Sequence, residues 1–324
     1  MLFDLRPKES RGELFGRDEE YRELKRLVDS GLWVAVIGKR MTGKTSLLKT
    51  FSNENKGVYV NLLGARSIED LVRKLAVESG FRLDEISLNL EFIQVKWTRV
   101  LEDFFSRIKD KVIALDEVQE VSSYYFLKVL KSVWDRYRDL RIIFSGSYVG
   151  VLRRLLEPSS TSPLYGRKPV KLLLKPFSRE VSRKFLESGF RENSKVKVKS
   201  GEIEEAVDRL NGYVGWLTYY GNFRCIRKLS HDEALKETIR EGSRIILDEL
   251  NNFLRGRRRE LYVKALRIVS NGARWSDVKR TLGVNSKVVK IVLETLSSAM
   301  IVESEEGYYW IEDPIVKEAV RRIR

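Results

Sequence analysis

A glycine-rich segment of the chain has the residue types and spacing of a phosphate-binding loop. Residues 38–45 match the pattern G-x-x-x-x-G-K-[ST], with glycines at 38 and 43 followed by Lys44 and Thr45. The glycines allow the backbone to wrap closely around a phosphate, and a helix starting there adds the positive end of its dipole. Lys44 would reach the β- and γ-phosphates, and the Thr45 hydroxyl would ligate Mg²⁺. A chance glycine-rich turn is the alternative, and the predicted strand before the loop and helix after it argue against that.

Two adjacent carboxylates follow a later apolar run. Asp116 and Glu117 come directly after Val112–Leu115, which reads as a buried strand. Ligands bind at the carboxyl ends of parallel strands in an open α/β sheet. Asp116 is suited to hold Mg²⁺, and Glu117 is suited to polarise an attacking water as a general base. The alternative is a solvated pair at the start of a surface helix.

These residues also distinguish between classes of phosphate-loop protein. A GTPase needs a guanine-reading Asn-Lys-x-Asp segment, and the only candidate, residues 55–58, has valine in place of the aspartate. A transporter-type ATPase needs a Leu-Ser-Gly-Gly-Gln-like segment, which the sequence lacks. A carboxylate beside the metal-binding aspartate favours hydrolysis by an activated water over transfer of the phosphoryl group to a small acceptor. The sequence therefore predicts hydrolysis of ATP to ADP and phosphate, with Mg²⁺.

Other polar residues are candidates to complete the site. Ser147 follows the strand-like run at 141–144, where its hydroxyl could sense the γ-phosphate, although a plain loop is equally compatible. Asn61 ends the run at 58–60 and could hold Glu117 in an idle orientation. An arginine that neutralises transition-state charge could be Arg136, Arg153 or Arg154, and the sequence does not choose among them. The catalytic set is thus Lys44, Asp116, Glu117 and Ser147.

Alternating strands and helices must position these residues. Apolar, β-branched runs at 32–37, 58–60, 111–115, 141–144 and 170–174 predict buried strands. Stretches with helical periodicity lie between them, at 46–51, 68–78, 92–108 and 124–137. This order predicts an α/β domain with a parallel sheet covered on both faces.

The remainder of the chain is organised differently. Residues 178–254 read as mostly helical, interrupted by a polar linker at 191–201. A basic segment at 255–259 introduces helices at 261–270, 276–282 and 286–299. Two strand-like runs, 300–303 and 308–311, then predict a hairpin with a four-residue loop. Three helices followed by a hairpin is the winged-helix order, so we expect domains at 1–177, 178–254 and 255–324.

Composition limits the possible settings of the protein. The 324 residues are 43% hydrophobic and 33% charged, which excludes wholesale disorder. A net charge of +15 suggests an anionic partner without identifying it as nucleotide, nucleic acid or membrane. Cys225 and His231 are the only residues of their kinds, so neither an intrachain disulfide nor an ordinary His/Cys zinc site is possible. Without a signal peptide or a long apolar run, the sequence is expected to be soluble and cytoplasmic.

Together these pieces resemble the archaeal ATPases of the STAND branch of AAA+-like P-loop proteins. The resemblance covers nearly the whole chain and includes the segments at 14–20, 38–45, 115–117, 144–147, 175–178, 212–216 and 311–314. It implies an ATPase core with strand order 5-1-4-3-2, a helical lid and a C-terminal winged helix. Many relatives carry a nucleotide-contacting proline in the segment at 212–216. The corresponding position here is Val214, which departs from that pattern.

The resemblance also implies which residues bind the nucleotide. Phe15, Gly16 and Arg17 would lie beside the adenine, whereas the sequence by itself shows only the start of a helix there. The full predicted set for ATP comprises this segment and the loop: Phe15, Gly16, Arg17, Gly38, Lys39, Arg40, Met41, Thr42, Gly43, Lys44, Thr45 and Ser46. Thr45 and Asp116 are the predicted ligands of Mg²⁺.

The sequence is compatible with two functions. The first is a molecular switch, in which the nucleotide state repositions the lid and winged helix for an unknown protein partner. The second is a DNA-associated ATPase akin to archaeal replication initiators, which also combine an ATPase core with a winged helix. In the predicted winged helix, the helix at 286–299 would enter the DNA groove. Its outer face carries Lys287 and Lys290 but also Glu294, and the tip of the hairpin carries Glu305 and Glu306. That charge pattern favours at most non-specific phosphate contact with DNA.

Overall fold

The computed structural model describes residues 1–80, 93–121, 124–146, 150–193 and 196–323. The chain forms two compact units. One unit is Pro7–Leu174, and the other combines Met1–Arg6 with Lys175–Arg324.

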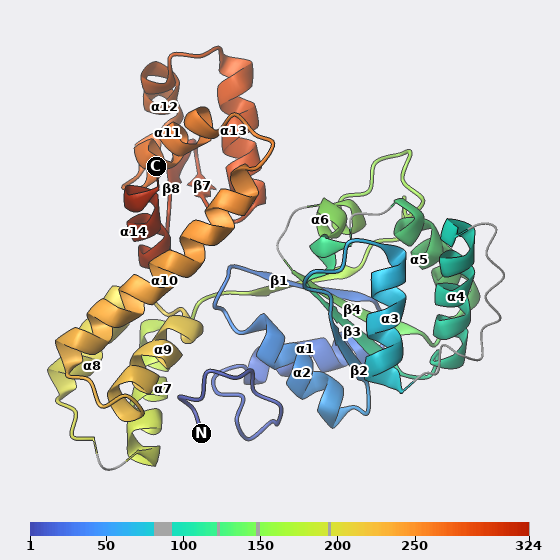
Figure 1. Ribbon diagram of the computed structural model, residues 1–324, viewed down its shortest axis with the longest axis horizontal. Coiled ribbons are helices and arrows are strands. Elements are labelled where there is room, and N and C mark those ends of the chain that lie inside the picture. Colours follow the sequence, from blue (N-terminus) through green and yellow to red (C-terminus); the bar gives the residue numbers. More distant parts are fainter. Residues whose placement is uncertain (81–92, 122–123, 147–149, 194–195, 324) are drawn as a thin grey trace. The chain divides into compact units, whose positions relative to one another are not determined.

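The first unit is built on a five-stranded parallel sheet (Figure 1). Its strands run in the order β2-β3-β4-β1-β5, which is the predicted order 5-1-4-3-2 read from the other edge. The bounds are β1 Val34–Gly38, β2 Val58–Asn61, β3 Val112–Asp116, β4 Arg141–Gly146 and β5 Val170–Leu174. The α/β fold and its strand order are therefore confirmed. The register places Asn61 opposite Asp116 at the carboxyl ends of β2 and β3.

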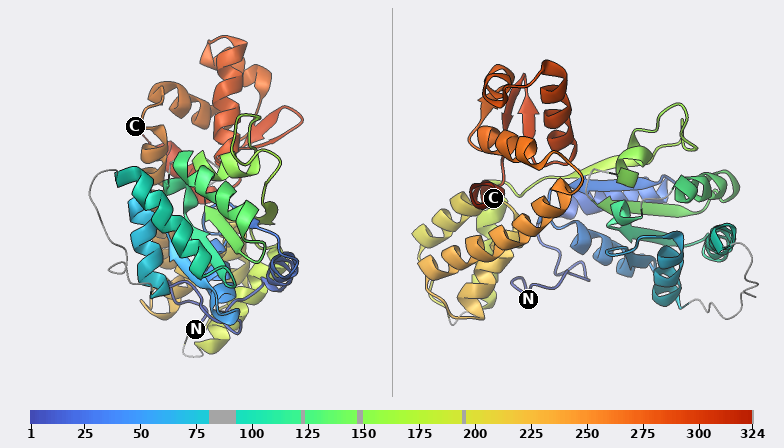
Figure 2. Two further views of the ribbon diagram at one scale, coloured as in Figure 1. Left: turned by 90° about the vertical axis from the view of Figure 1, so that its right-hand side faces the viewer. Right: turned by 45° about the horizontal axis from the view of Figure 1, so that its top comes forward.

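Helices cover both faces of this sheet (Figure 2). Strand β1 shows why, because Val34 and Val36 belong to one hydrophobic cluster while Ala35 and Ile37 belong to the other. Helices α1 (Asp18–Asp29) and α2 (Lys44–Glu54) pack into the first cluster. The second cluster is packed by α3 (Ile68–Ser79), α4 (Ile93–Arg107), α5 (Tyr124–Arg136), α6 (Gly150–Leu156) and the short 3₁₀ helix η2 (Val118–Glu120).

The first residues of the chain belong to the second unit, which differs from the predicted assignment of residues 1–177 to the core. The Phe3 ring is fully buried against Gly189 and Gly221, where added Cβ atoms would collide with it. It also packs edge-on against Phe185 and Phe190. The segment before Pro7 is too short to show helical or strand periodicity, so the helices that contact Phe3 could not be predicted.

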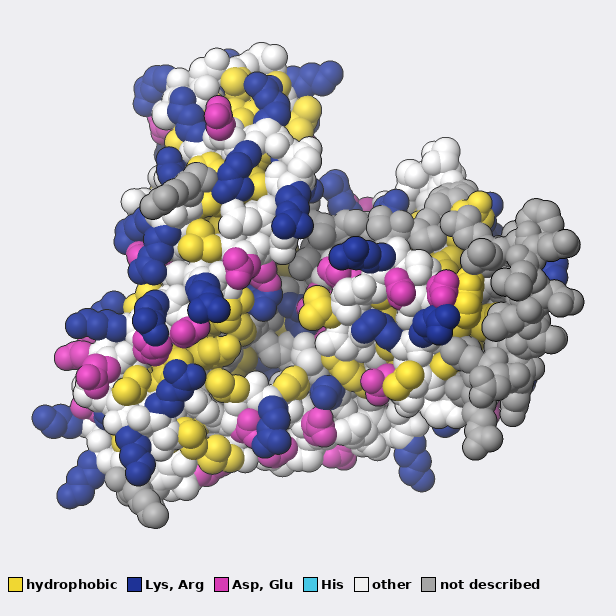
Figure 3. All heavy atoms as spheres, viewed as in Figure 1, with side chains coloured by type: hydrophobic (Ala, Val, Ile, Leu, Met, Phe, Trp, Pro, Cys, Tyr) yellow, Lys and Arg dark blue, Asp and Glu magenta, His cyan; other side chains and the backbone are white. Residues whose placement is uncertain are grey.

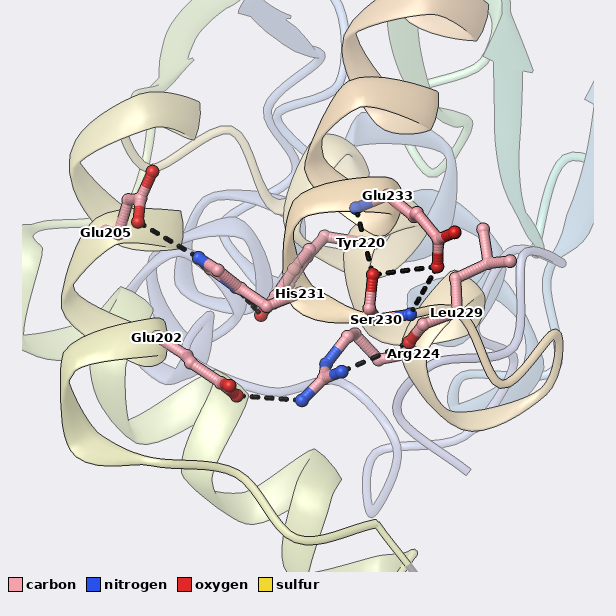
Figure 4. A network of polar contacts seen from close by, with 8 residues as sticks. All are labelled: Glu202, Glu205, Tyr220, Arg224, Leu229, Ser230, His231 and Glu233. Carbon is pink, nitrogen blue, oxygen red and sulfur yellow. Dashed lines mark hydrogen bonds and ion pairs between the residues drawn. The ribbon is translucent and has the colours of Figure 1, made fainter.

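Four helices form the body of the second unit. They are α7 (Arg179–Glu192), α8 (Ser200–Leu210), α9 (Val214–Cys225) and α10 (His231–Leu254), in agreement with the helical character predicted for 178–254. A polar network joins α8, α9 and the start of α10 (Figure 4). In it the buried Arg224 donates to Glu202 at 2.7 Å, and His231 bridges the Tyr220 hydroxyl at 2.8 Å and Glu205 at 3.1 Å. The single histidine is thus used in packing helices together.

The last part of this unit contains helices and a small antiparallel sheet. Its elements are α11 (Arg259–Val269), β6 (Ala273–Arg274), α12 (Trp275–Leu282), α13 (Ser286–Ser298), β7 (Glu303–Glu305), β8 (Tyr308–Trp310) and α14 (Pro314–Arg322). The sheet order is β6-β8-β7. The predicted four-residue hairpin loop was wrong, because Glu305 pairs with Tyr308 and only Glu306 and Gly307 form the turn. Among the helices described, none has the length and apolar character needed to cross a membrane.

Candidate functional site

The turn between β1 and α2 has the tight geometry that a phosphate loop requires. Gly43 caps α2 at φ 94°, a left-handed conformation that glycine adopts without strain. Met41 also has a positive φ of 61°, so two of three successive loop residues have a left-handed backbone. The Thr42 hydroxyl donates to the Lys39 carbonyl at 2.8 Å. At the other end, a Cβ on Gly38 would lie 2.5 Å from the Leu174 carbonyl oxygen, so β5 leaves space for glycine alone.

Lys44 extends back over this loop. Its ammonium donates to the carbonyl oxygens of Gly38 at 2.8 Å and Lys39 at 2.9 Å. Burial lowers the pKa of Lys44, the charges of Glu117 and Asp116 raise it, and the charge of Arg40 lowers it further. The structure therefore brings the predicted lysine and both predicted carboxylates into one electrostatic environment.

Asp116 lies at the centre of the polar groups at the sheet edge. It ends β3 with 1% of its surface exposed. Its Oδ2 accepts hydrogen bonds from the Thr45 hydroxyl at 2.7 Å and the Tyr59 hydroxyl at 2.9 Å. Its Oδ1 accepts one from the Glu117 backbone at 3.1 Å. These donors offset the cost of burying a carboxylate, and burial together with Asp116 raises the pKa of Tyr59.

The same oxygens suit a magnesium ion. Mg²⁺ prefers oxygen ligands and is usually bound through one or two protein groups, with water and substrate phosphates completing its shell. Thr45 and Asp116 supply two such oxygens already 2.7 Å apart beside the loop. The residues that the structure describes contain no cluster of three or more His, Cys, Asp or Glu side chains able to hold a metal by themselves. The donor set therefore fits Mg²⁺ delivered with a nucleotide.

The segment before α1 also reaches the phosphate loop. Arg17 is 4% exposed and donates to the Thr42 carbonyl at 2.8 Å, and its other terminal nitrogen pairs with Glu20 at 2.5 Å. Burial lowers the pKa of Arg17, and Glu20 opposes this effect. Phe15 is half-buried beside Gly16. The side chain of Arg17 thus supports the loop backbone, and contact of this segment with adenine remains a prediction.

The remaining sequence candidates lie in different places. Ser147 falls outside the described residues, and Asn61 accepts a hydrogen bond from the Leu63 backbone at 2.8 Å. The arginine candidates lie on exposed helix surfaces: Arg136 pairs with Glu102 at 3.7 Å, Arg153 pairs with Glu157 at 3.3 Å, and Arg154 is exposed.

Two polar residues of the site were missed from the sequence. Tyr59 donates to Asp116, and Gln119 donates through Nε2 to Oε2 of Glu117. In the sequence Tyr59 lies between two valines of a predicted strand. Its position on β2, next to β3 in the predicted order, was the available signal. Gln119 lies two residues after Glu117. Side chains at this spacing meet only if the chain turns at once, and it does so here in η2.

The five-stranded parallel sheet, the loop after β1 and the buried acidic residue beside Thr45 define a P-loop nucleotide-binding protein. Residues 14–219 match the model of an ATPase domain found predominantly in Archaea. The chain belongs to this ATPase family.

A solved structure supports the same assignment. The chain is 32% identical to the Walker-type ATPase PABY2304 of Pyrococcus abyssi, with a TM-score of 0.84 and coverage of 99% of this chain and 100% of that one. It also resembles Cdc6p from Pyrobaculum aerophilum at 14% identity, with a TM-score of 0.52 over 98% of this chain and 97% of that one. The second likeness is one of fold alone. A search of curated proteins gives no significant match.

Proposed function

We propose that this protein is a Mg²⁺-dependent ATPase whose nucleotide state is transmitted to a partner. The hydrogen bond of 2.7 Å between the Thr45 hydroxyl and Asp116 carries the enzymatic part of the proposal. It joins the phosphate loop to the acidic end of β3, and these are the two groups that a magnesium nucleotide must contact together.

Each side chain has a defined task in this mechanism. Lys44, which now donates to the Gly38 and Lys39 carbonyls, would turn its ammonium toward phosphate oxygens. Thr45 and Asp116 would hold Mg²⁺, which supplies charge neutralisation on the phosphates when bound. Glu117 would accept a proton from the attacking water at its carboxylate. Arg17 would keep the loop backbone in place through the Thr42 carbonyl.

The metal assignment can be tested with one isosteric substitution. Asp116→Asn removes the charge while preserving the size of the side chain, so ATP turnover in Mg²⁺ should fall at least about tenfold. Phosphate release is measured across Mg²⁺ concentrations and after chelation with EDTA. Asp110→Asn, at an exposed position two residues before β3, is the matched control and should retain wild-type turnover. Equal rates for the two variants would remove Asp116 from the metal site.

The switch is the finer part of the proposal. Its support is the division of the chain into a nucleotide-binding unit and a second unit, joined at residues 6–7 and 174–175. In the second unit, α7–α10 would act as a helical lid. The elements α11–α13 with the β6-β8-β7 sheet would form the winged helix, since they follow that order. The partner would be a protein, and a cytoplasmic setting agrees with a chain that has a single cysteine.

Energy transfer between two dyes tests this movement. In a Cys225→Ser background, the substitutions Val77→Cys and Ile291→Cys allow one dye to be attached to each unit. Val77 is 79% exposed and Ile291 is 49% exposed. Transfer efficiency should differ between ATP and ADP in a Glu117→Gln variant that retains ATP. Adding Lys44→Ala should abolish the nucleotide-dependent difference. Identical efficiency with ATP, with ADP and without nucleotide would contradict the switch.

DNA association is the alternative for the second unit. Lys and Arg side chains predominate on the visible surface over α11–α13 (Figure 3), which favours an anionic partner. Against this, Lys290 pairs with Glu294 at 3.7 Å, and Glu305 and Glu306 are exposed at the hairpin. Duplex binding that weakens steeply with salt and changes with ATP would favour DNA over a protein partner.

A further inference from the structure

The short turn after β3 places a neutral amide against the predicted general base. Gln119 lies in η2 and donates a hydrogen bond through Nε2 to Oε2 of Glu117. The backbone makes this contact possible because Glu117 adopts a left-handed φ of 56°, which turns the chain so that residue 119 reaches back to residue 117. Such a conformation is uncommon for a residue other than glycine and costs about 1 kcal/mol or more. The presence of this costly backbone conformation indicates that the surrounding structure fixes the orientation of Glu117.

Two further contacts fix this turn. The Glu117 backbone N–H donates to Asp116 Oδ1 at 3.1 Å, so the base is tied to the proposed metal ligand. Val118, between Glu117 and Gln119, is fully buried in the hydrophobic cluster beneath α3–α6. The main chain on both sides of the Glu117 side chain is therefore held by packing and hydrogen bonding, and Gln119 holds the carboxylate itself.

The end of β4 is shaped around the Gln119 amide. Gly146 has φ +153°, and a Cβ built there would approach Gln119 Oε1 to less than 3.0 Å. The same Cβ would lie 3.3 Å from the Val118 backbone nitrogen. Gly146 therefore leaves the space that the amide carbonyl occupies, and a side chain at this position would displace it.

Glu117 shares an electrostatic environment with the lysine of the phosphate loop. Its negative charge raises the pKa of Lys44 against the lowering effect of burial, and Asp116 acts in the same direction. Lys44 itself donates to the carbonyls of Gly38 and Lys39 in that loop. A hydrogen bond from a neutral amide fixes one carboxylate oxygen without adding charge, so the carboxylate keeps its capacity to accept a proton. Asn61, the sequence candidate for contacting Glu117, is engaged with the Leu63 backbone instead.

We propose that Gln119 is a positioning residue for ATP hydrolysis, which holds Glu117 in the orientation that polarises the attacking water, and that Gly146 provides the space for it. This inference rests on the proposed function of the site. Gln119 makes no contact with substrate in this role, and it acts through Glu117.

Three single variants separate the hydrogen bond from the packing. Gln119→Ala removes the whole amide, and Gln119→Glu keeps its size but places a carboxylate where the donor was. Gly146→Ala displaces the amide without altering either partner. Each should lower kcat about tenfold or more, as expected for loss of a hydrogen bond to a charged group, while KM for ATP stays near the wild-type value. Thermal unfolding and nucleotide binding of each variant serve as controls for folding.

A double-mutant cycle provides the decisive measurement. In a Glu117→Gln background, Gln119→Ala and Gln119→Glu should cause no further loss of kcat, because the carboxylate that Gln119 positions is gone. The inference would be overturned if the losses in kcat of the Glu117 and Gln119 variants were fully additive, or if Gln119→Glu kept the wild-type kcat. A rise in kcat in a Gln119 variant would also overturn it, because the contact would then hold Glu117 in an inactive orientation. If Glu117→Gln slows turnover and Gln119→Glu does not, only this inference fails. Absence of Mg²⁺-dependent turnover in the wild type would end the proposed function and this inference together.

Discussion

Lys44→Ala should abolish ATP turnover and weaken ATP binding, with an expected loss in kcat/KM of at least about 100-fold. The lysine side chain reaches back over the phosphate loop, where it donates to the carbonyls of Gly38 and Lys39. Alanine removes the buried ammonium that would compensate the charge of a triphosphate. The measurements are steady-state phosphate release and titration with a fluorescent ATP analogue.

Lys25→Ala is the matched control for this variant. Lys25 is exposed on α1 and pairs with Asp29 at 3.2 Å. Removing it changes net charge equally but should leave kcat/KM within about twofold of wild type, because surface ion pairs contribute little. Turnover by Lys44→Ala at the wild-type rate would show that phosphate is bound elsewhere.

Much of the first unit could be predicted because its three central strands, β1, β3 and β4, are buried on both faces. Such strands form unbroken apolar runs, and all five runs became strands of the sheet. The carboxyl ends of β1 and β3 then had to carry the phosphate loop and the acidic pair on the same edge. The hydrogen bond between Thr45 and Asp116 follows from that arrangement.

Features set by single contacts could not be predicted in this way. The attachment of Phe3 to α7 and α9 depends on two small residues, Gly189 and Gly221, that lie far away in the sequence. The contact between Gln119 and Glu117 depends on a left-handed backbone at residue 117, and nothing in the residue type of glutamate predicts it. Periodicity reports which faces are buried, whereas these contacts depend on the shape of the backbone at one position.

Glu117→Gln should separate binding of ATP from its hydrolysis. The amide preserves the size of the side chain but cannot accept a proton as the carboxylate does, so kcat should fall about 100-fold or more. Binding of ATP should persist, because the proposed phosphate and metal contacts are made by Lys44, Thr45 and Asp116. Single-turnover phosphate release measures the chemical step, and the fluorescent analogue measures affinity for the nucleotide.

A neighbouring carboxylate provides the matched control for Glu117→Gln. Glu120 lies in the same turn, η2, and its Oε2 accepts a hydrogen bond from the Gly64 backbone at 3.3 Å. Glu120→Gln therefore makes the same chemical change three residues away and should leave the single-turnover rate unaltered. If Glu117→Gln instead loses ATP affinity in proportion to its rate, the carboxylate supports the shape of the site and the proton must go to another group. The contact between Gln119 and Glu117 would then stabilise the turn after β3 without a role in the chemical step.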